Sequence, residues 1–164
     1  MFINSKRPRM KTISLIASLA FFIEINANTI QVANPGNNND IKPNLQAAIN
    51  SAVNGDVIQL PAGTFIVNGS VSITKFISIK GKGIDSTILY RSETTSDASL
   101  NGVSIFRFNI NSISPSHIVV SGITFKSKTP SVAQGDGFSL AQDSGIEMIK
   151  CIDFIITNCK FQYF

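Results

Sequence analysis

The chain has 164 residues, of which 15% are charged, with 12 phenylalanines, no tryptophan and a formal net charge of +4. This length allows one domain at most, and the apolar content is sufficient to bury a core. Removing residues 1–27 takes away four basic residues and one acidic residue, so that the net charge falls from +4 to +1. This balance does not support nucleic acid as a partner, and no Gly-rich phosphate loop indicates a nucleotide cofactor.

Residues 1–27 have the features of a secretory signal peptide. Four basic residues precede the mainly apolar run Ile13–Ile25, and Ala27 supplies a small residue for cleavage. The run is shorter than the roughly 20 residues that a spanning helix needs. Because Glu24 lies within the run, an uncleaved buried helix is the alternative. We therefore predict a secreted protein, extracellular or periplasmic, with no membrane span once the mature chain begins near Asn28.

Residues 45–53 predict a short amphipathic helix. Apolar residues recur at the spacing of one helical face, at Leu45, Ala48, Ile49, Ala52 and Val53. Asp40 is the predicted N-cap, Pro43 suits the first turn, and Asn54-Gly55 suits the end. A helix this short is marginal alone, so its apolar stripe is expected to cover a core.

The segment from Ile58 to Tyr90 predicts strands of three to five residues separated by short turns. In each strand two apolar residues flank a third and so share one face, which we expect to point inward, at Ile58/Leu60, Phe65/Val67, Val71/Ile73, Ile77/Ile79 and Ile88/Tyr90. Asn-Gly turns are also typical of hairpins, so an antiparallel meander is the alternative. A chain that bends, continues and stacks on its next coil fits such short strands better.

Residues Leu45–Leu89 resemble the pectate lyase-like superfamily, and the resemblance is looser as far as Phe164. The matching features are the helix, then GDVIQLPAGTF, then ISIKGKGIDSTIL. The resemblance implies an all-β fold, a right-handed parallel β-helix with a short N-terminal capping α-helix. Many activities share this architecture, so the resemblance does not specify one reaction.

Later segments predict further coils at Gly102–Asn109, Ile118–Phe125 and Gly145–Phe164. An offset of 36 positions places Phe154 on Ile118, Ile156 on Val120, Cys159 on Ile123 and Phe161 on Phe125, and an offset of 41 places Ile79 on Val120 and Gly81 on Gly122. Both offsets exceed the about 22–25 residues expected of a bare coil. The segments Tyr90–Asn101 and Lys126–Ser144 are therefore predicted to leave the wall as excursions.

The sequence stops in a strand pattern, with no helix or polar coil after it. A solenoid needs a capping unit at each end. We therefore expect residues 28–164 to be the N-terminal cap and first coils of a longer protein. A naturally short chain capped by a partner is the alternative.

Asp136, Asp143 and Glu147 are the candidate catalytic or metal-binding acids, because they gather in or just after the Lys126–Ser144 segment. The resemblance implies lyase or glycoside hydrolase chemistry, which uses paired carboxylates or Ca²⁺ with a basic residue. The family's active-site residues have no residue-by-residue match here, so its active-site coils would be mostly absent. Whether the chain is an enzyme stays open, since loop aspartates also form Asx-turns.

Five lysines are predicted to point outward and to meet an acidic polysaccharide, namely Lys80, Lys82, Lys126, Lys128 and Lys160. The alternative is that they are solvated lysines that hinder lateral strand pairing. The sequence thus predicts a secreted protein that acts on or binds acidic polysaccharide. A non-catalytic surface or adhesin-type β-helix is the alternative function.

Three other reactive residues have structural interpretations. His117, the only histidine, is either a general base or, as we favour, a surface residue. Cys159 aligns with an inward Ile and Cys151 falls in a turn, which favours free thiols over a mutual disulfide. No further Cys or His lies near them in sequence to indicate a metal site.

Overall fold

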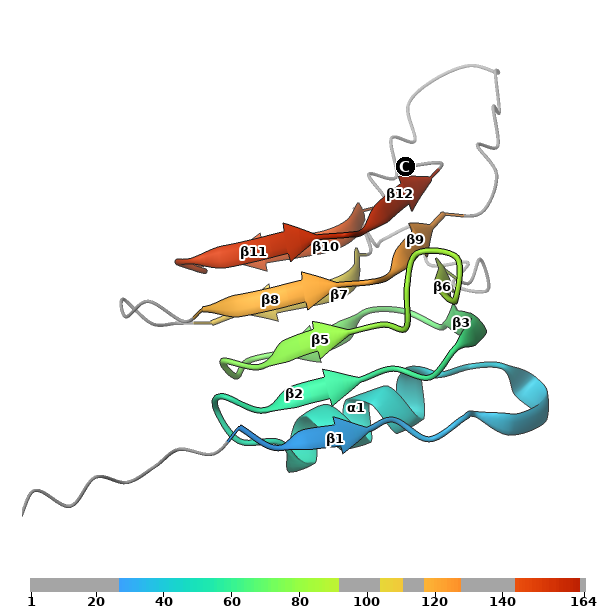
Figure 1. Ribbon diagram of the computed structural model, residues 1–164, viewed down its shortest axis with the longest axis horizontal. Helices are drawn as coiled ribbons and strands as arrows, with labels where there is room; N and C mark the ends of the chain where they lie inside the picture. The colour runs from blue at the N-terminus through green and yellow to red at the C-terminus, as the bar shows by residue number, and fades with distance from the viewer. Residues whose placement is uncertain (1–26, 92–103, 111–116, 128–143, 163–164) are drawn as a thin grey trace, which may run out of the picture.

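The computed structural model describes residues 27–91, 104–110, 117–127 and 144–162 (Figure 1). These residues form twelve strands in three all-parallel sheets, together with one α-helix and one short 3-10 helix. Sheet A has the order β1-β2-β5-β8-β11, sheet B β12-β9-β6-β3 and sheet C β10-β7-β4. Each full coil gives one strand to each sheet in turn. The fold is therefore a parallel β-helix, as predicted, and the antiparallel meander is wrong.

The strands are short, as the spacing of the turns predicts. Sheet A consists of β1 (Thr29–Gln31), β2 (Val57–Gln59), β5 (Ser78–Lys80), β8 (Ile118–Ser121) and β11 (Phe154–Thr157). Sheet B consists of β3 (Gly63–Val67), β6 (Thr87–Arg91), β9 (Thr124–Lys126) and β12 (Lys160–Gln162). Sheet C consists of β4 (Val71–Ile73), β7 (Ser104–Asn109) and β10 (Ser144–Ile149). The helix α1 spans Lys42–Ser51, and the 3-10 helix spans Gly36–Asn38.

Figure 1 shows the path of the chain. The strands of sheet A run from left to right along the front, and the chain returns behind them through sheets B and C while it rises. This sense of winding is right-handed, the hand that parallel strand connections almost always take. The helix α1 lies beneath the first coil.

The predicted registers are confirmed. Phe154 pairs with Ile118, Ile156 with Val120, Phe161 with Phe125 and Ile79 with Val120. Gly81 also stacks on Gly122 as predicted, since the Gly81 N–H donates to the Ser121 carbonyl at 2.8 Å. A fixed offset between similar segments of the sequence thus predicts which residues of successive coils pair with each other.

The predicted inward face of β6 is wrong. Leu89 is buried, whereas Ile88 and Tyr90 are only half-buried and face outward. The buried Thr87 explains this, because its hydroxyl donates to the Pro61 carbonyl and accepts from the Lys82 N–H, both at 2.9 Å. A polar inward residue therefore starts the strand. The predicted excursions also begin late, since β6 continues through Arg91 and Lys126 belongs to β9.

The helix α1 differs from the prediction at both ends. Its N-cap is Ile41, not Asp40, although the Asp40 carboxylate accepts the Lys42 N–H at 3.0 Å. Its C-cap is Ala52 in an extended conformation, so Asn54-Gly55 does not end the helix. Val53 consequently leaves the apolar stripe and is 59% exposed. Pro43 lies in the first turn as predicted.

Lys75 satisfies the C-terminal carbonyls of α1. Its Nζ donates to the carbonyls of Ile49, Asn50 and Ala52 at 3.1, 2.7 and 2.7 Å. The last carbonyls of a helix have no partner within it and carry partial negative charge. A cation from the turn between β4 and β5 therefore supplies the cap and joins α1 to the first coil.

The lower edge of each sheet is covered by a different part of the N-terminal cap. In sheet A, β1 pairs with β2. In sheet B, Ile41 N–H donates to the Ile66 carbonyl at 3.0 Å, and Ile66 N–H to the Asn39 carbonyl at 2.8 Å. In sheet C, the Gln46 amide takes the place of a strand, accepting the Ser72 N–H at 2.9 Å and donating to its carbonyl at 3.0 Å. Edge strands with unpaired groups otherwise attract other chains.

The core is a continuous apolar column that becomes aromatic in the upper coils. Phe106 meets Phe125 edge-on at 5.2 Å between ring centroids, and Phe125 stacks on Phe161 at 5.1 Å. Phe106 and Phe125 are fully buried, whereas Phe161 and Ile156, the inward residues of the last described coil, are 46% and 41% exposed. Each inward residue is therefore buried by the coil above it as well as by the coil below.

The ammonium of Lys75 should contribute to stability. We expect Lys75→Met to lower the free energy of unfolding by about 1–3 kcal/mol, because it leaves three carbonyls at the end of α1 without their charged donor. Urea unfolding followed by circular dichroism measures this. The control Lys80→Met removes an exposed lysine and should change the value by less than about 0.5 kcal/mol. Equal effects of the two substitutions would contradict the capping role.

The Gly81–Gly122 stacking contact should be sensitive to an added methyl group. A Cβ at Gly122 would lie 3.0 Å from the Gly81 carbonyl oxygen, whereas one at Gly36 meets nothing within 4 Å. Both glycines have left-handed φ, +69° and +76°, so both alanine variants have a similar cost from the backbone conformation itself. We expect Gly122→Ala to destabilise by about 1–3 kcal/mol more than Gly36→Ala in urea unfolding. A smaller loss for Gly122→Ala would mean that the coils separate there at little cost.

Candidate functional site

The predicted acids are only partly within the described structure. Asp136 and Asp143 lie outside it, whereas Glu147 lies on β10, on the outer side of sheet C. Glu147 pairs directly with Arg107 on β7, and Arg107 Nε lies 3.3 Å from Glu147 Oε2. The hydroxyl of the buried Ser104 donates to the same oxygen at 3.1 Å. Glu147 is thus a cross-strand partner of an arginine.

The contacts of Glu147 are sufficient to explain it as part of the wall. Opposite charges on adjacent strands stabilise a sheet modestly, and the side chains of Arg107 and Glu147 are 53% and 34% exposed. Glycosidic chemistry needs a second carboxyl group, and the predicted companions of Glu147 are not among the described residues. No group of three or more His, Cys, Asp or Glu in the described segments is placed to hold a metal ion.

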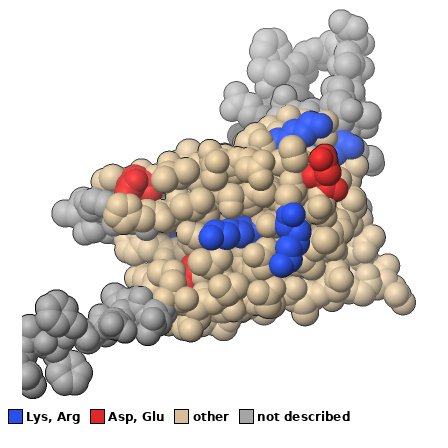
Figure 2. Space-filling model, in the orientation of Figure 1, with Lys and Arg blue, Asp and Glu red and all other residues tan. Residues whose placement is uncertain are grey.

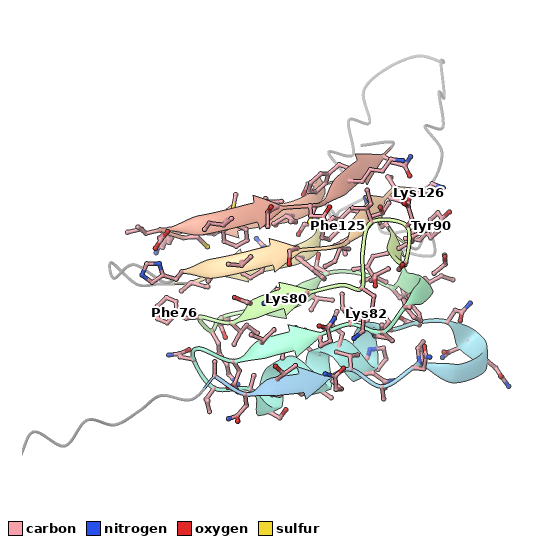
Figure 3. The ribbon with its side chains drawn as sticks, viewed as in Figure 1. Phe76, Lys80, Lys82, Tyr90, Phe125 and Lys126 are labelled. Carbon is pink, nitrogen blue, oxygen red and sulfur yellow. The ribbon has the colours of Figure 1, made fainter. Side chains whose placement is uncertain are left out.

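The predicted lysines form a basic face over sheets A and B. Lys80 on β5, Lys82 in the following turn and Lys160 on β12 lie on the surface. Figure 2 shows basic side chains over the middle of sheet A and again at its upper right, and Figure 3 shows Lys80 and Lys82 side by side. Within the described chain neither Lys80 nor Lys82 has an ion pair. Lys128 lies outside these residues.

Lys126 has a specific partner that the sequence did not reveal. Its Nζ lies 2.8 Å from the Tyr90 hydroxyl and 4.9 Å from the centre of the Tyr90 ring. An ammonium over an aromatic face is attracted by the ring quadrupole. Tyr90 and Lys126 are register partners on β6 and β9, at the same sequence offset that relates the last two coils. That offset could have identified the pair.

The structure does not bring all the predicted residues into one site. Lys80 lies on sheet A, Lys126 and Lys160 lie on sheet B, and Glu147 lies on the outer side of sheet C. In Figure 1, sheet A is at the front and β7 and β10 lie behind it. A single cleft with a catalytic acid between binding lysines is therefore not formed by the residues that the structure describes.

His117 is a surface residue, as we favoured. Its side chain is 83% exposed, and its Nδ1 lies 2.5 Å from Asp153 Oδ2. Both residues have left-handed φ, 44° and 61°, at equivalent turns of successive coils. Asp153 follows His117 by the offset of these two coils, so this contact too is a register contact. The pair links two turns and meets no described nucleophile.

The two cysteines are free thiols, and the alternative of a mutual disulfide is wrong. They lie at opposite ends of β11, a distance that a disulfide cannot span. Cys159 Sγ is 3.6 Å from the Val120 carbonyl oxygen and 3.4 Å from that of Thr157. Burial raises the pKa of the Cys159 thiol, against smaller opposing contributions from the backbone of Ile123 and Gly122. Half-burial suits a small apolar residue in the last described coil.

A shallow groove runs along α1 at the base of the molecule. It is lined by Asp40, Lys42, Pro43, Gln46, Ala47, Asn50 and Asn68. Its most polar groups already have structural partners, since Gln46 holds Ser72 and Asp40 holds the Lys42 N–H. We assign it to the cap.

No protein-family model matches the chain, and no curated protein matches its sequence. The structure therefore establishes the architecture, while the resemblance to one superfamily remains an expectation. None of the helices in the described residues is both long and apolar enough to cross a membrane. The predicted signal peptide covers residues 1–27, and all of it except Ala27 lies outside the described structure.

The raised pKa of Cys159 predicts slow alkylation. In a Cys151→Ser variant, the rate with iodoacetamide follows the thiolate fraction. We expect the folded protein to reach its half-maximal rate at a higher pH than the same variant unfolded in urea, because burial disfavours the thiolate. Mass spectrometry of timed samples measures both profiles. Coincident midpoints would show that this thiol is as solvated as in the unfolded chain.

Proposed function

We propose that this protein is a secreted β-helix whose basic face binds an acidic polysaccharide. The basic face consists of Lys80, Lys82, Lys126 and Lys160. The observation that supports the proposal best is that Lys80 and Lys82 lie together on the surface, without an ion partner in the described chain. Secretion rests on the pattern of residues 1–27 alone.

Two other side chains on the described walls, Arg107 and His117, differ from these lysines in having acidic partners. Arg107 is held by Glu147, and His117 by Asp153. Those pairs are explained by contacts between coils, whereas the charges of Lys80 and Lys82 have no such explanation. Asp85, in the same turn as Lys82, is also exposed. The basic face still has a positive excess, because its four lysines outnumber this one acid. Positive charge on an extended wall attracts a linear polyanion over several coils.

Tyr90 gives the face a further element suited to sugars. Its ring is oriented by Lys126, and Tyr presents both an apolar ring and a hydroxyl at a half-exposed position. Lyase or hydrolase chemistry would require Asp136 and Asp143 beside Glu147. The same three acids would have to bind Ca²⁺ if the chemistry used it. Binding is therefore the part of the proposal that the described residues support.

A non-catalytic surface scaffold is the second candidate. It is favoured by the Arg107–Glu147 ion pair of sheet C, which acts between coils and neutralises both charges, and by the contact of His117 with Asp153, which links two successive turns. In that case the lysines only keep neighbouring molecules from pairing at the walls.

Binding to polygalacturonate distinguishes the two candidates. We expect the full chain to bind this polymer at low ionic strength, with affinity falling as salt screens the lysines, and not to bind neutral dextran. The double variant Lys80→Ala/Lys82→Ala should bind about three- to tenfold more weakly, as the loss of two exposed ion pairs would cause. Isothermal titration or affinity electrophoresis measures this.

The matched control is Lys42→Ala/Lys150→Ala, which removes two charges outside the basic face. It should bind polygalacturonate as the parent chain does. Absence of binding by the parent chain would favour the scaffold, and equal losses in both double variants would mean that net charge alone attracts the polymer.

A further inference from the structure

Two Asn-Gly pairs lie in turns of the first coil, and their contacts differ. Asn54-Gly55 lies between α1 and β2, and Asn68-Gly69 lies between β3 and β4. Both asparagines are exposed, and the two glycines have similar left-handed φ, 95° and 83°. The pairs are thus matched in residue type, exposure and backbone conformation, and the groups around them distinguish one from the other.

The reactive groups of Asn54-Gly55 are both held by one residue. The Gly55 N–H donates to the Phe76 carbonyl at 2.6 Å, and the Phe76 N–H donates to Asn54 Oδ1 at 3.0 Å. A hydrogen-bonded amide has to lose its partner, through a local opening of the structure, before its nitrogen can react. The turn before β5 therefore protects this pair.

The backbone nitrogen of the second pair is accessible. The Gly69 N–H has no hydrogen-bond partner among the residues that the structure describes. Lys42 lies beside it, since a Cβ on Gly69 would lie 3.0 Å from Lys42 Nζ. A nearby cation favours the anionic form of a group, here the Gly69 amide nitrogen after it has lost its proton. That form is the nucleophile in the cyclisation of an Asn-Gly pair.

We propose that Asn68 is a site of spontaneous deamidation and that Asn54 is protected from it. The deprotonated Gly69 nitrogen attacks Asn68 Cγ, a bond forms between these atoms, and the Cγ–Nδ2 bond breaks. Ammonia leaves with the proton that the amide gave up. Water then adds to one of the two carbonyl carbons of the succinimide ring, which opens to aspartate or isoaspartate without a change of oxidation state. Glycine permits the ring to close because it has no Cβ to obstruct it.

The products alter the covering of the first coil. Each adds a negative charge beside the Asp40 carboxylate, which accepts the Asn68 N–H at 3.4 Å and the Lys42 N–H at 3.0 Å. Isoaspartate also inserts a methylene group into the main chain between β3 and β4. These strands are hydrogen-bonded to the cap on either side of the pair, at Ile66 and at Ser72. Deamidation at Asn68 therefore weakens the attachment of the cap to sheets B and C.

Site-resolved rates test the difference between the two pairs. The full chain is incubated in mildly alkaline buffer, and timed samples are digested and analysed by mass spectrometry. In the folded protein, Asn68 should deamidate about tenfold or more faster than Asn54, because Asn54 reacts only after its turn opens. In urea the two rates should agree within about threefold, because the folded contacts are lost.

Two results would overturn the proposal. One is an equal or higher rate at Asn54 in the folded protein. The other is a difference that persists undiminished in urea, because the neighbouring sequence and not the fold would then cause it. The pair Asn101-Gly102 lies outside the described residues, and peptide mapping separates it from the other two.

Lys42→Met tests the neighbouring charge. It should slow deamidation at Asn68 by about two- to fivefold and leave the rate at Asn54 unchanged. The control Lys80→Met removes a lysine from sheet A and should change neither rate. An unchanged rate in Lys42→Met, or an equal fall in both variants, would overturn the contribution of Lys42.

Ageing of the protein tests the effect on the cap. After the same incubation, the urea midpoint of the parent chain should fall, whereas that of Asn68→Gln should not, because glutamine would have to close a larger ring and reacts far more slowly. Any change at Asn101 is common to both chains. Equal falls in the two midpoints would overturn the link between Asn68 and the stability of the cap.

Discussion

Each coil of this protein is stabilised chiefly by the coils on either side of it, because its strands form hydrogen bonds only with theirs. The three sheets have no hairpin among the described strands, so the ladder bonds of a strand always reach another coil, as between β2 and β5. The inward residues obey the same rule. Phe125 is buried because Phe106 and Phe161 pack against it from neighbouring positions. Stability in such an array is close to a sum over adjacent repeats.

Because the first coil has no coil below it, the lower edges of its strands need other hydrogen-bond partners. Three different parts of the N-terminal cap supply them. A strand pairs with sheet A, an extended segment next to α1 pairs with sheet B, and the Gln46 side chain imitates a strand against sheet C. The helix that carries Gln46 is itself tied to the first coil by Lys75. The cap is therefore a covering for backbone groups as much as for apolar side chains, and it leaves the outer walls free.

The outer walls divide by chemistry. Sheet C carries a neutralised pair, Arg107 and Glu147, whereas sheet A and the turn after β5 carry two lysines without such partners in the described chain. A parallel β-helix repeats every outward position at the strand spacing, so a small preference at one position becomes a column. Lys80 and Lys82, which have no ion partner in the described chain, are the reason that we propose an acidic polymer as the ligand of the basic face.

The sequence alone determined the architecture and its register. Short apolar pairs between turns indicated stacked coils, and the two repeat offsets identified Phe161 with Phe125 and Ile79 with Val120. These predictions succeed because inward positions must be apolar at a fixed spacing in every coil. The outward direction of Lys80, Lys126 and Lys160 followed from the same alternation.

Only the tertiary structure decided which polar residues meet. The inward face of β6 depends on hydrogen bonds of Thr87 to Pro61 and Lys82. The end of α1 depends on Lys75, which belongs to a turn three strands further along the chain. Periodicity reveals neither of these contacts. The partners of Lys126, Glu147 and His117 come from the coil below or above. The repeat offset of 36 places Lys126 opposite Tyr90 and His117 opposite Asp153. Many residue types can occupy such positions, so the offset identifies the neighbours without showing that their side chains interact.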